Sequence, residues 1–365
     1  MPRSAIVAID VPILVSVILL LVVGPYILWT GIASVGFVLA RRGESPTPPC
    51  KWPAVTIAIP ASNGVDDPLL QSVYACDYPT DRMEILLLDR GTSPSGSGNE
   101  GIVRTVSIDD PSSALSVSSA APSHCLDAAQ GDVLLTLPAE GAVPPGWIGS
   151  MVRRCKKDAP IVVGPTVVEH GDLFLPRLQA LQQLGRLAVL GGLSQLRVPV
   201  SRNAPNMAVH VETLKRDQEP SGSARPLTFA SEADAAVRER PASTFKEMVS
   251  RQAQWLQQSA QASSWISQAQ AVGLWFVHAV LFACSIVAVG LPAWRQPTLL
   301  ALIGKMGADV VLSLPAANHY GQRGLLRSIV PSELMRLLAI PIAGVWALVP
   351  SHFFPDAGST SPPDV

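Results

Sequence analysis

The chain has 365 residues, of which 48% are hydrophobic and only 15% are charged, and its net charge is −1. Soluble domains carry about 25% charged residues, so this composition indicates a membrane protein. The balanced charge, without a Lys/Arg cluster, argues against a nucleic-acid partner. The five cysteines are scattered and form no C-x-x-C pair, which argues against a zinc site or a disulfide framework and fits a reducing compartment.

The first apolar segment, Val11–Ala40, contains no charged residue and is followed by Arg41 and Arg42. A membrane helix needs about 20 apolar residues, so this segment is long enough to cross a bilayer. A signal peptide is the alternative, but the run is too long for one and its basic pair follows it. The positive-inside rule places the chain after Arg42 in the cytoplasm.

Three further apolar segments lie near the C-terminus, at 271–294, 297–314 and 337–354. The second contains Lys305 and Asp309, which are four residues apart and therefore share one helical face. The pair could neutralise itself inside a helical bundle, or the segment could be a re-entrant or surface helix. We expect four membrane spans in total, with three as the alternative.

The region between these segments alternates between predicted strands and helices. Apolar runs at 55–60 and 84–89 have the length and pattern of buried parallel strands, and a helix-length segment separates them. The alternation continues with a strand at 133–137, an amphipathic helix at 147–154 and a strand at 161–165. It predicts an α/β fold with a parallel or mixed sheet and helices on both faces.

The predicted organisation has four parts. They are an N-terminal transmembrane helix (1–42), a cytoplasmic α/β domain (43–259), a set of interfacial and transmembrane helices (260–356) and a disordered tail (357–365). An interfacial helix is also an option for 252–270, which lacks charge and contains Trp255.

The motifs of the middle region occur in a characteristic order. Asp77-Tyr78-Pro79 is followed by Glu84-Ile85 and Asp89, and Asn203 to Ala208 reads N-A-P-N-M-A. In this order they resemble the family 2 glycosyltransferases, membrane-attached inverting enzymes of the GT-A fold, and especially their processive or lipid-linked synthases. A tryptophan at the place of the family's Q-x-x-R-W motif, Trp255, adds to the resemblance.

The resemblance implies a role for each of several residues. Ligands of such sheets collect at the carboxyl ends of the strands, where Pro60 and Asp89 fall. The implied nucleotide-sugar contacts are Pro60, Ala61, Asn63, Asp89 and Asn206. Glu140 is the implied ligand of a Mn²⁺ or Mg²⁺ ion, Arg251 and Trp255 the acceptor or diphosphate region, and Glu232 or Asp234 the general base.

The chain also departs from the family pattern at several of these places. Arg90 replaces the second residue of the usual Asp-Asp pair, Glu140 ends the stretch where Asp-x-Asp is usual, and Gln254 replaces the arginine of Q-x-x-R-W. No segment matches the motif that bears the general base. The polar loop 215–226 stands where its helix would be.

The family motifs that are kept and those that are lost allow two functions. In the first, an inner-membrane, multi-pass enzyme transfers a sugar from a nucleotide sugar to a lipid or polysaccharide acceptor. In the second, catalysis is impaired, and the protein is a nucleotide-sugar binding or scaffolding partner of an active synthase. Two observations would separate them: turnover of a nucleotide sugar, and binding of one without turnover.

Overall fold

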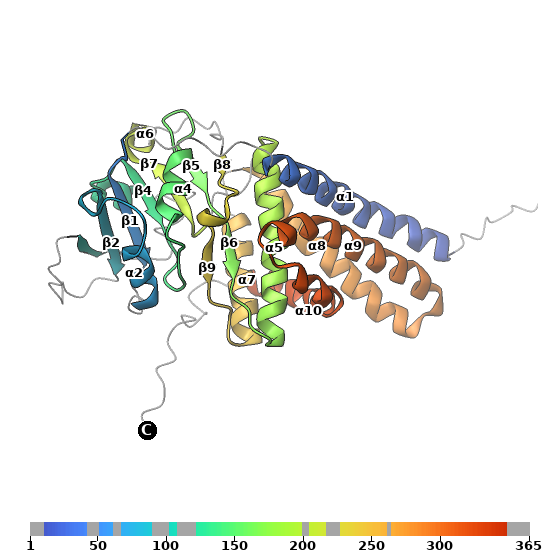
Figure 1. Ribbon diagram of the computed structural model, residues 1–365. Coiled ribbons are helices and arrows are strands. Elements are labelled where there is room, and N and C mark those ends of the chain that lie inside the picture. Colours follow the sequence, from blue (N-terminus) through green and yellow to red (C-terminus); the bar gives the residue numbers. More distant parts are fainter. Residues whose placement is uncertain are drawn as a thin grey trace, which may run out of the picture.

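The computed structural model describes residues 11–41, 51–60, 67–89, 102–107, 122–198, 204–216, 227–260 and 264–348. Figure 1 shows two parts along the long direction of the molecule. One is an α/β part, and the other is a group of long helices that extends away from it.

The α/β part is built on a seven-stranded sheet with the order β3-β2-β1-β4-β7-β5-β8. Strand β7 runs antiparallel to both of its neighbours, and the other described pairings are parallel. The strands are β1 (Val55–Pro60), β2 (Met83–Asp89), β3 (Val103–Ser107), β4 (Val133–Thr136), β5 (Ile161–Val163), β7 (Met207–His210) and β8 (Leu227–Phe229). The predicted α/β sheet is therefore confirmed.

Helices cover both faces of this sheet, as an apolar parallel sheet requires. One face packs against α2 and α4, around the fully buried Leu69, Trp147 and Ile148. The other face packs against α3 and α6, through Leu126 and Val211. The four helices are α2 (Asp67–Tyr74), α3 (Pro122–Ala128), α4 (Trp147–Arg154) and α6 (Val211–Arg216), and a 3₁₀ turn, η1 (Thr80–Arg82), precedes β2.

A small second sheet lies beyond the carboxyl ends of the large one. It pairs β6 (Thr166–Val168) with β9 (Val237–Glu239) in parallel. Strand β5 leads directly into β6, and β8 leads into β9 through the 3₁₀ turn η3 (Ala233–Ala235). Because β5 and β8 run parallel to β1 and β4, the carboxyl edge of the large sheet faces the small sheet and the helices after it.

Helix α5 (Phe174–Gln195) runs crosswise to the long helices, between them and the sheets (Figure 1). It crosses α1 (Val11–Ala40) at Gly36 and Gly192, where a Cβ on Gly192 would lie only 1.9 Å from the carbonyl oxygen of Ala33. The two backbones touch here because neither glycine has a side chain. Helix α7 (Phe245–Ala260) forms a crosswise layer together with α5. The side chain of Gln179 of α5 exchanges two hydrogen bonds with the backbone of Ala242, just before α7.

Four helices in the described part of the chain are long and apolar enough to cross a membrane. They are α1, α8 (Trp265–Gly290), α9 (Pro292–His319) and the segment Arg323–Ala347, which contains the 3₁₀ turn η4 (Arg323–Ser328) and α10 (Ile329–Ala347). The predicted segment 297–314 lies inside α9, and 271–294 lies mostly in α8. The predicted 252–270 helix is instead divided between α7 and α8.

Four charged residues of these helices form one group in their interior. The Lys305 Nζ lies 2.8 Å from Asp309 Oδ2, and the two side chains are only 2% and 3% exposed. Glu333 and Arg336 of α10 complete the group, with Arg336 2.8 Å from Glu333 and 3.1 Å from Asp309. Of the two alternatives for Lys305 and Asp309, the structure has the pair neutralised in the interior of the bundle, and the two added charges also cancel.

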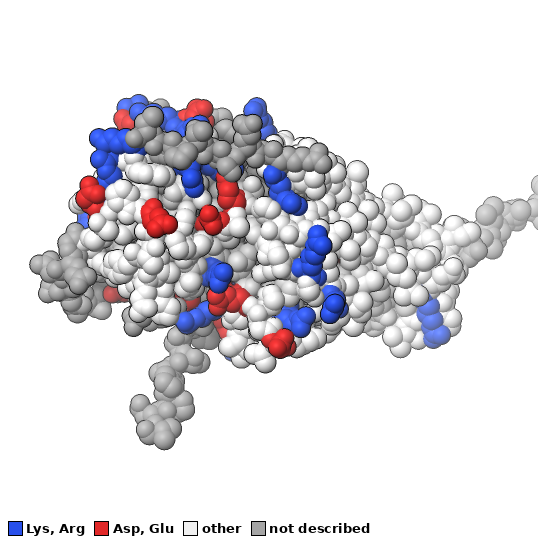
Figure 2. All heavy atoms as spheres, in the orientation of Figure 1, with Lys and Arg blue, Asp and Glu red and all other residues white. Residues whose placement is uncertain are grey.

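The surface reflects the same division. In Figure 2 the charged side chains gather over the α/β part and the adjoining ends of the helices, while few lie over the long helices beyond. Exposed large apolar residues are frequent there, among them Leu20, Leu28 and Val289. Exposed apolar surface on this scale is typical of a contact with lipid.

Candidate functional site

Three neighbouring strands bring predicted site residues to the carboxyl edge of the large sheet. Pro60 is the buried last residue of β1, and it lies opposite Leu88 of β2. Asp89 ends β2 and is half-buried. Leu137 extends β4 past its end, because its amide donates to the carbonyl of Ala58 at 3.1 Å. The predicted residues Ala61 and Asn63 follow β1 and lie outside the described residues.

Glu140 sits in the loop after β4, and that loop is fixed to the small sheet. Gly141 has φ +136, and a Cβ on it would lie 2.0 Å from the carbonyl oxygen of Arg238. Ala142 then exchanges two backbone hydrogen bonds with Arg238, each of 2.9 Å. Only glycine combines this φ with so close an approach to a neighbouring backbone. The exposed Glu140 carboxylate is thus presented from a rigid loop next to β9.

The side chain of Asn206, a predicted nucleotide-sugar contact, is bonded to protein groups on every side that the structure describes. Its side chain is fully buried, and its Oδ1 accepts from Trp147 Nε1 at 3.1 Å. Its Nδ2 donates to the carbonyls of Pro165 and Ala235 at 2.8 and 2.9 Å. Both N–H donors of the amide are used by protein carbonyls, and its oxygen, which accepts from Trp147, is buried. Asn206 instead fixes η3 to α4 and to the β5–β6 connection.

The two predicted base residues, Glu232 and Asp234, flank the start of η3 in different environments. Glu232 forms a two-pronged ion pair with Arg154 of α4, with N···O distances of 3.0, 3.0 and 2.5 Å. The pair is largely buried, with side chains 16% and 21% exposed. Both oxygens of the Glu232 carboxylate are thus occupied by the Arg154 guanidinium.

Asp234 is exposed and lies over the N-terminus of α4. Its carboxylate is close to Gly146, where a Cβ would meet Asp234 Oδ2 at 3.1 Å. Among the described residues, no hydrogen-bond or ion-pair partner holds this carboxylate. Of the two acidic residues, Asp234 is therefore the one whose carboxylate is available.

Arg251 and Trp255 lie one turn apart on α7, where both already have protein partners. Arg251 forms ion pairs with Glu247 at 2.7 Å and with Glu239 of β9 at 3.4 Å. Trp255 lies beneath the guanidinium of Arg186, at 5.2 Å from the ring centroid. Arg186 comes from α5 and also donates to the side chain of Gln252.

Two pKa values in this cluster are shifted by burial. Burial lowers the pKa of Arg186 to about 10, and the charge of Arg336 adds to this effect. Burial likewise raises the pKa of Glu239 above its ordinary value, although Arg251 and Arg186 oppose the shift. The negative charge of Glu140 contributes to it as well, so Glu140, Glu239 and Arg251 act within one electrostatic environment.

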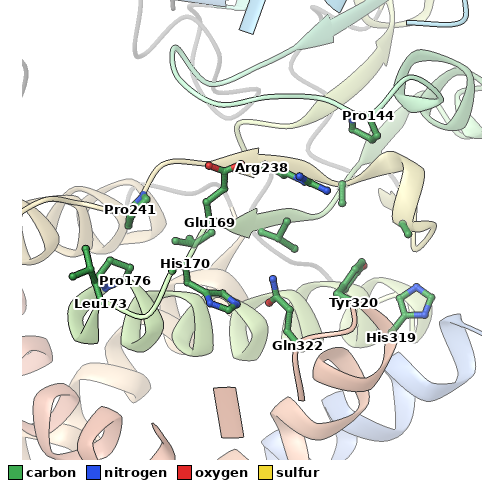
Figure 3. Close-up of a pocket in the computed structure, with 15 residues that line it drawn as sticks. Pro144, Glu169, His170, Leu173, Pro176, Arg238, Pro241, His319, Tyr320 and Gln322 are labelled. Carbon is green, nitrogen blue, oxygen red and sulfur yellow. The ribbon is translucent and has the colours of Figure 1, made fainter. Parts of the chain in front are cut away.

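A groove lies between the small sheet and the long helices (Figure 3). Its volume is about 810 Å³. Glu169, His170 and Arg238 line it from the small sheet and the loop after β6, and His319, Tyr320 and Gln322 line it from the end of α9. The groove is continuous with the Glu140 loop, because Pro144 and Arg238 contribute to its wall and Arg238 pairs with Ala142.

Two side chains at the end of α9 connect this groove to η3. His319 Nε2 lies 2.6 Å from the carbonyl of Ser231, and the Tyr320 hydroxyl donates to the same carbonyl at 3.5 Å. Burial raises the pKa of Tyr320 above its ordinary value, and the nearby charge of Glu232 adds to the shift. The turn that carries Asp234 is thus held to the helical bundle on one side and to Asn206 on the other.

The described residues contain no cluster of three or more His, Cys, Asp or Glu side chains that could hold a metal by itself. Asp89 and Glu140 follow β2 and β4, which lie on either side of β1. Mg²⁺ is often bound by one or two carboxylates together with substrate phosphates. Two separated carboxylates at one edge fit an ion of this kind that arrives with a diphosphate.

Sequence reasoning missed the groove residues and Arg186. His170 shows no ligand spacing in the sequence, and His319 lies at the end of an apolar helix. Arg186 lies in α5 without a charged residue next to it in the sequence, far along the chain from Trp255. No local pattern joins these positions, because the groove is formed by segments that only the fold brings together.

No family profile and no curated protein sequence matches this chain. Solved structures do resemble it. The mannosyltransferase PcManGT from Pyrobaculum calidifontis, in complex with GDP-Man and Mn²⁺, aligns with 92% of this chain and 99% of its own, with a TM-score of 0.50 and 15% identity. GalNAc-T7 with UDP, GalNAc and Mn²⁺ aligns with 52% of this chain and 44% of its own, with a TM-score of 0.35 and 14% identity.

The first of these likenesses extends over the α/β part and the long helices alike, because it covers nearly all of both chains. At 15% identity it concerns the fold. The predicted fold class, a GT-A-like mixed sheet with added apolar helices, is confirmed. The second likeness is too weak to support an argument.

Proposed function

We propose that this protein transfers a sugar from a nucleotide sugar to a lipid or glycan acceptor at a membrane. The main support is the position of the groove. The loop that carries Glu140 is joined to one wall of the groove through the pairing of Ala142 with Arg238, and the opposite wall is the end of α9, one of the apolar helices. A donor bound at the edge and an acceptor held in the membrane would therefore meet in one place. The family 2 resemblance and the glycosyltransferase fold agree with this function.

In this proposal the donor lies along the ends of β1, β2 and β4. Pro60, Ala61, Asn63 and Asp89 contact the nucleotide, and Glu140 holds a Mn²⁺ or Mg²⁺ ion through its carboxylate. Such an ion neutralises the charge that develops on a leaving nucleoside diphosphate. The PcManGT structure contains GDP-Man and Mn²⁺, so GDP-mannose is the first donor to test.

Asp234 is the proposed general base. Its carboxylate is exposed and without a protein partner among the described residues, whereas Glu232 is held by Arg154. Ala233 of η3 and Ala236, which follows η3, line the groove, so an acceptor hydroxyl there would be near Asp234. Glu232 then has a positioning role, because its ion pair with α4 fixes the start of η3.

Arg251 and Trp255 are proposed to border the acceptor side without touching the diphosphate in this conformation. Neither lines the groove, and Arg251 is occupied by Glu239 and Glu247. The guanidinium of Arg186 stacks on the Trp255 ring. It supplies positive charge at the place where Gln254 has removed the arginine of the Q-x-x-R-W pattern.

The membrane placement of the proposal follows the distribution of charge. The α/β part, proposed to extend over 43–259, lies on the cytoplasmic side of an inner membrane, and the apolar helices are embedded. Arg41, at the end of α1 next to the α/β part, donates to the carbonyl of Pro315 at 3.2 Å. Its position agrees with the preference of basic residues for the cytoplasmic side.

The proposal is tested with the purified protein in detergent, supplied with Mn²⁺ or Mg²⁺, a membrane-lipid extract and a panel of GDP- and UDP-sugars. The expected result is a metal-dependent release of nucleoside diphosphate together with a glycosylated product. Donor binding without turnover across the panel would instead support the scaffolding partner of an active synthase. No binding of any donor would contradict both functions.

A further inference from the structure

Helix α10 begins on the side of the bundle that faces the α/β part. Leu326 and Ile329, immediately before and at its start, pack with the α5 cluster that also contains Ala316 and Ala317 of α9. Those two residues lie in the last turn of α9, whose end at His319 bonds the backbone of Ser231. The start of α10 is therefore at the level of α5.

The other end of α10 returns to the same side. Gln257 Nε2, near the end of α7, donates to the carbonyl of Ala347 at 2.8 Å. Helix α7 belongs to the crosswise layer with α5, since Arg186 of α5 bonds Gln252 and stacks on Trp255. A helix that crossed the bilayer would separate its two ends by the thickness of the hydrocarbon core, about 30 Å.

The middle of α10 reaches a moderate depth. Arg336 contacts Asp309, which precedes the end of α9 at His319 by ten residues, or about 15 Å at a rise of about 1.5 Å per residue. Pro341 accepts a hydrogen bond from Trp275 Nε1 at 3.4 Å, and Trp275 follows the start of α8 by ten residues. Both contacts are about equally far into the bundle, so the helix runs across it.

The inner and outer faces of α10 differ in polarity. The inner face places Glu333 and Arg336 against the Lys305–Asp309 pair, where the four charges cancel. The outer face carries an apolar stripe at three- and four-residue spacing. Its members are Val330, Leu334, Leu338, Ile342 and Val345, each between 47% and 62% exposed.

We infer that α10 does not cross the membrane but lies in the leaflet next to the α/β part, with its apolar stripe covered by lipid. Three helices, α1, α8 and α9, then form the spans, and the chain after Ala347 is on the same side as the α/β part. Lipid is the occupant because the stripe continues the exposed apolar surface of the spanning helices. The inference rests on the membrane placement proposed above but is independent of catalysis.

Helix α8 offers the matched control for a depth measurement. In a cysteine-free background in lipid nanodiscs, single spin labels replace Val330, Leu338 or Val345 on α10, and Val272, Ile286 or Val289 on α8. All six positions are exposed. Accessibility to oxygen and to a polar nickel complex gives the depth of each label.

The expected result is that the α10 labels remain in one leaflet, while the α8 series passes through the bilayer centre. An α10 series that passes through the centre as α8 does would overturn the inference and leave the membrane placement intact. An α8 series without contact with lipid would contradict both.

The side of the C-terminus gives a second, independent readout. A protease-cleavable tag is fused after Val365 of the full chain, in sealed membrane vesicles of known orientation. Cleavage of the tag and of loops in the α/β part is expected from the same side of the vesicle. Protection of the tag under conditions that digest those loops would show a fourth crossing and would overturn the inference.

Discussion

Acidic residues occur in two regions of this molecule, and their surroundings are opposite. At the carboxyl edge of the sheet, Asp89, Glu140 and Asp234 come from three separate loops or strand ends; Asp89 is half-buried and the other two are exposed. In the helical bundle, Asp309 and Glu333 are buried and shared between Lys305 and Arg336. A carboxylate saturated by cations inside a bundle holds helices together, whereas an open carboxylate at a strand end can still bind a metal or a proton. The chemistry is therefore expected at the sheet edge.

The largest effect is expected from Asp234→Asn. General bases contribute about 10²- to 10⁴-fold to a rate, so sugar transfer should fall by about that factor while donor binding is unchanged. Initial rates of transfer and donor titrations measure the two quantities separately. Glu232→Gln is the matched control, and it should lower stability more than it lowers the transfer rate. A greater rate loss in Glu232→Gln would exchange the roles of the two residues.

Removal of a charge from the buried group in the helical bundle should lower the stability of the protein. Lys305→Met leaves Asp309 and Glu333 with Arg336 as their one cationic partner, and an uncompensated buried charge costs about 3–5 kcal/mol. The thermal unfolding midpoint in detergent should fall clearly. The double variant Lys305→Met/Glu333→Gln restores the charge balance and should recover part of the loss. Equal stability of the single variant and the wild type would show that water reaches these charges.

Asn206 holds η3 in place next to the groove. Asn206→Ala leaves the Trp147 Nε1 donor and the Ala235 carbonyl without their partner, while the Pro165 carbonyl keeps the Val237 amide. A buried unsatisfied group costs about 1–3 kcal/mol. Chemical unfolding should show this loss, and transfer should weaken as well. Gln183→Ala removes a single part-buried hydrogen bond, from the Gln183 side-chain amide to the carbonyl of Thr166, and should cost less. A fully active, fully stable Asn206→Ala protein would contradict the positioning role.

The crossing of α1 and α5 should be sensitive to one methyl group. Gly192→Ala places a Cβ against the Ala33 carbonyl, and overpacking of this kind costs about 1–3 kcal/mol. Gly185 lies on the same helix, but its nearest neighbour would be Ser313 Oγ at 3.6 Å. Gly185→Ala should therefore be neutral or slightly stabilising, because alanine favours helix over glycine. Unfolding midpoints of the two variants test this contrast.

The smallest effect concerns the pH dependence of Glu247. Burial alone would raise its pKa, but hydrogen bonds from Ser243 and the charge of Arg251 outweigh burial and lower it. A carboxyl group with a lowered pKa stabilises the fold above its ordinary pKa of about 4.3, and this contribution is lost as the pH falls through the lowered value. Wild-type stability should therefore decline more steeply than that of Glu247→Gln below that pH. The difference should be within about 1 kcal/mol, since the pair is near the surface.

The sequence predicted the fold well because its signals are local. The apolar runs at 55–60 and 84–89 and the uncharged Val11–Ala40 each contain enough information to form one element. The spacing of Lys305 and Asp309 also predicted their pairing correctly. Glu333 and Arg336 were not predicted to join them, because nothing in a sequence shows which helix brings its charges to a given depth.

The site was less predictable, for the same physical reason. A motif gives the type of a side chain but not its partners. Asn206 matched a family motif, yet its amide is consumed by Trp147, Pro165 and Ala235. The sequence alone does not separate Glu232 from Asp234 as the general base. The fold does, because it pairs Arg154 with Glu232. The groove itself depends on the end of α9, which lies far along the chain from β6.

The most direct test of the sheet-edge site is metal-dependent donor binding. Calorimetric titration of GDP-mannose and other nucleotide sugars is carried out with and without Mn²⁺, on the wild type, Glu140→Ala and Glu169→Ala. Glu169 is a matched exposed carboxylate in the adjoining groove. Donor binding is expected to need Mn²⁺, to be lost in Glu140→Ala and to be kept in Glu169→Ala. Binding that is indifferent to Mn²⁺ and to Glu140 would contradict a metal site at the sheet edge.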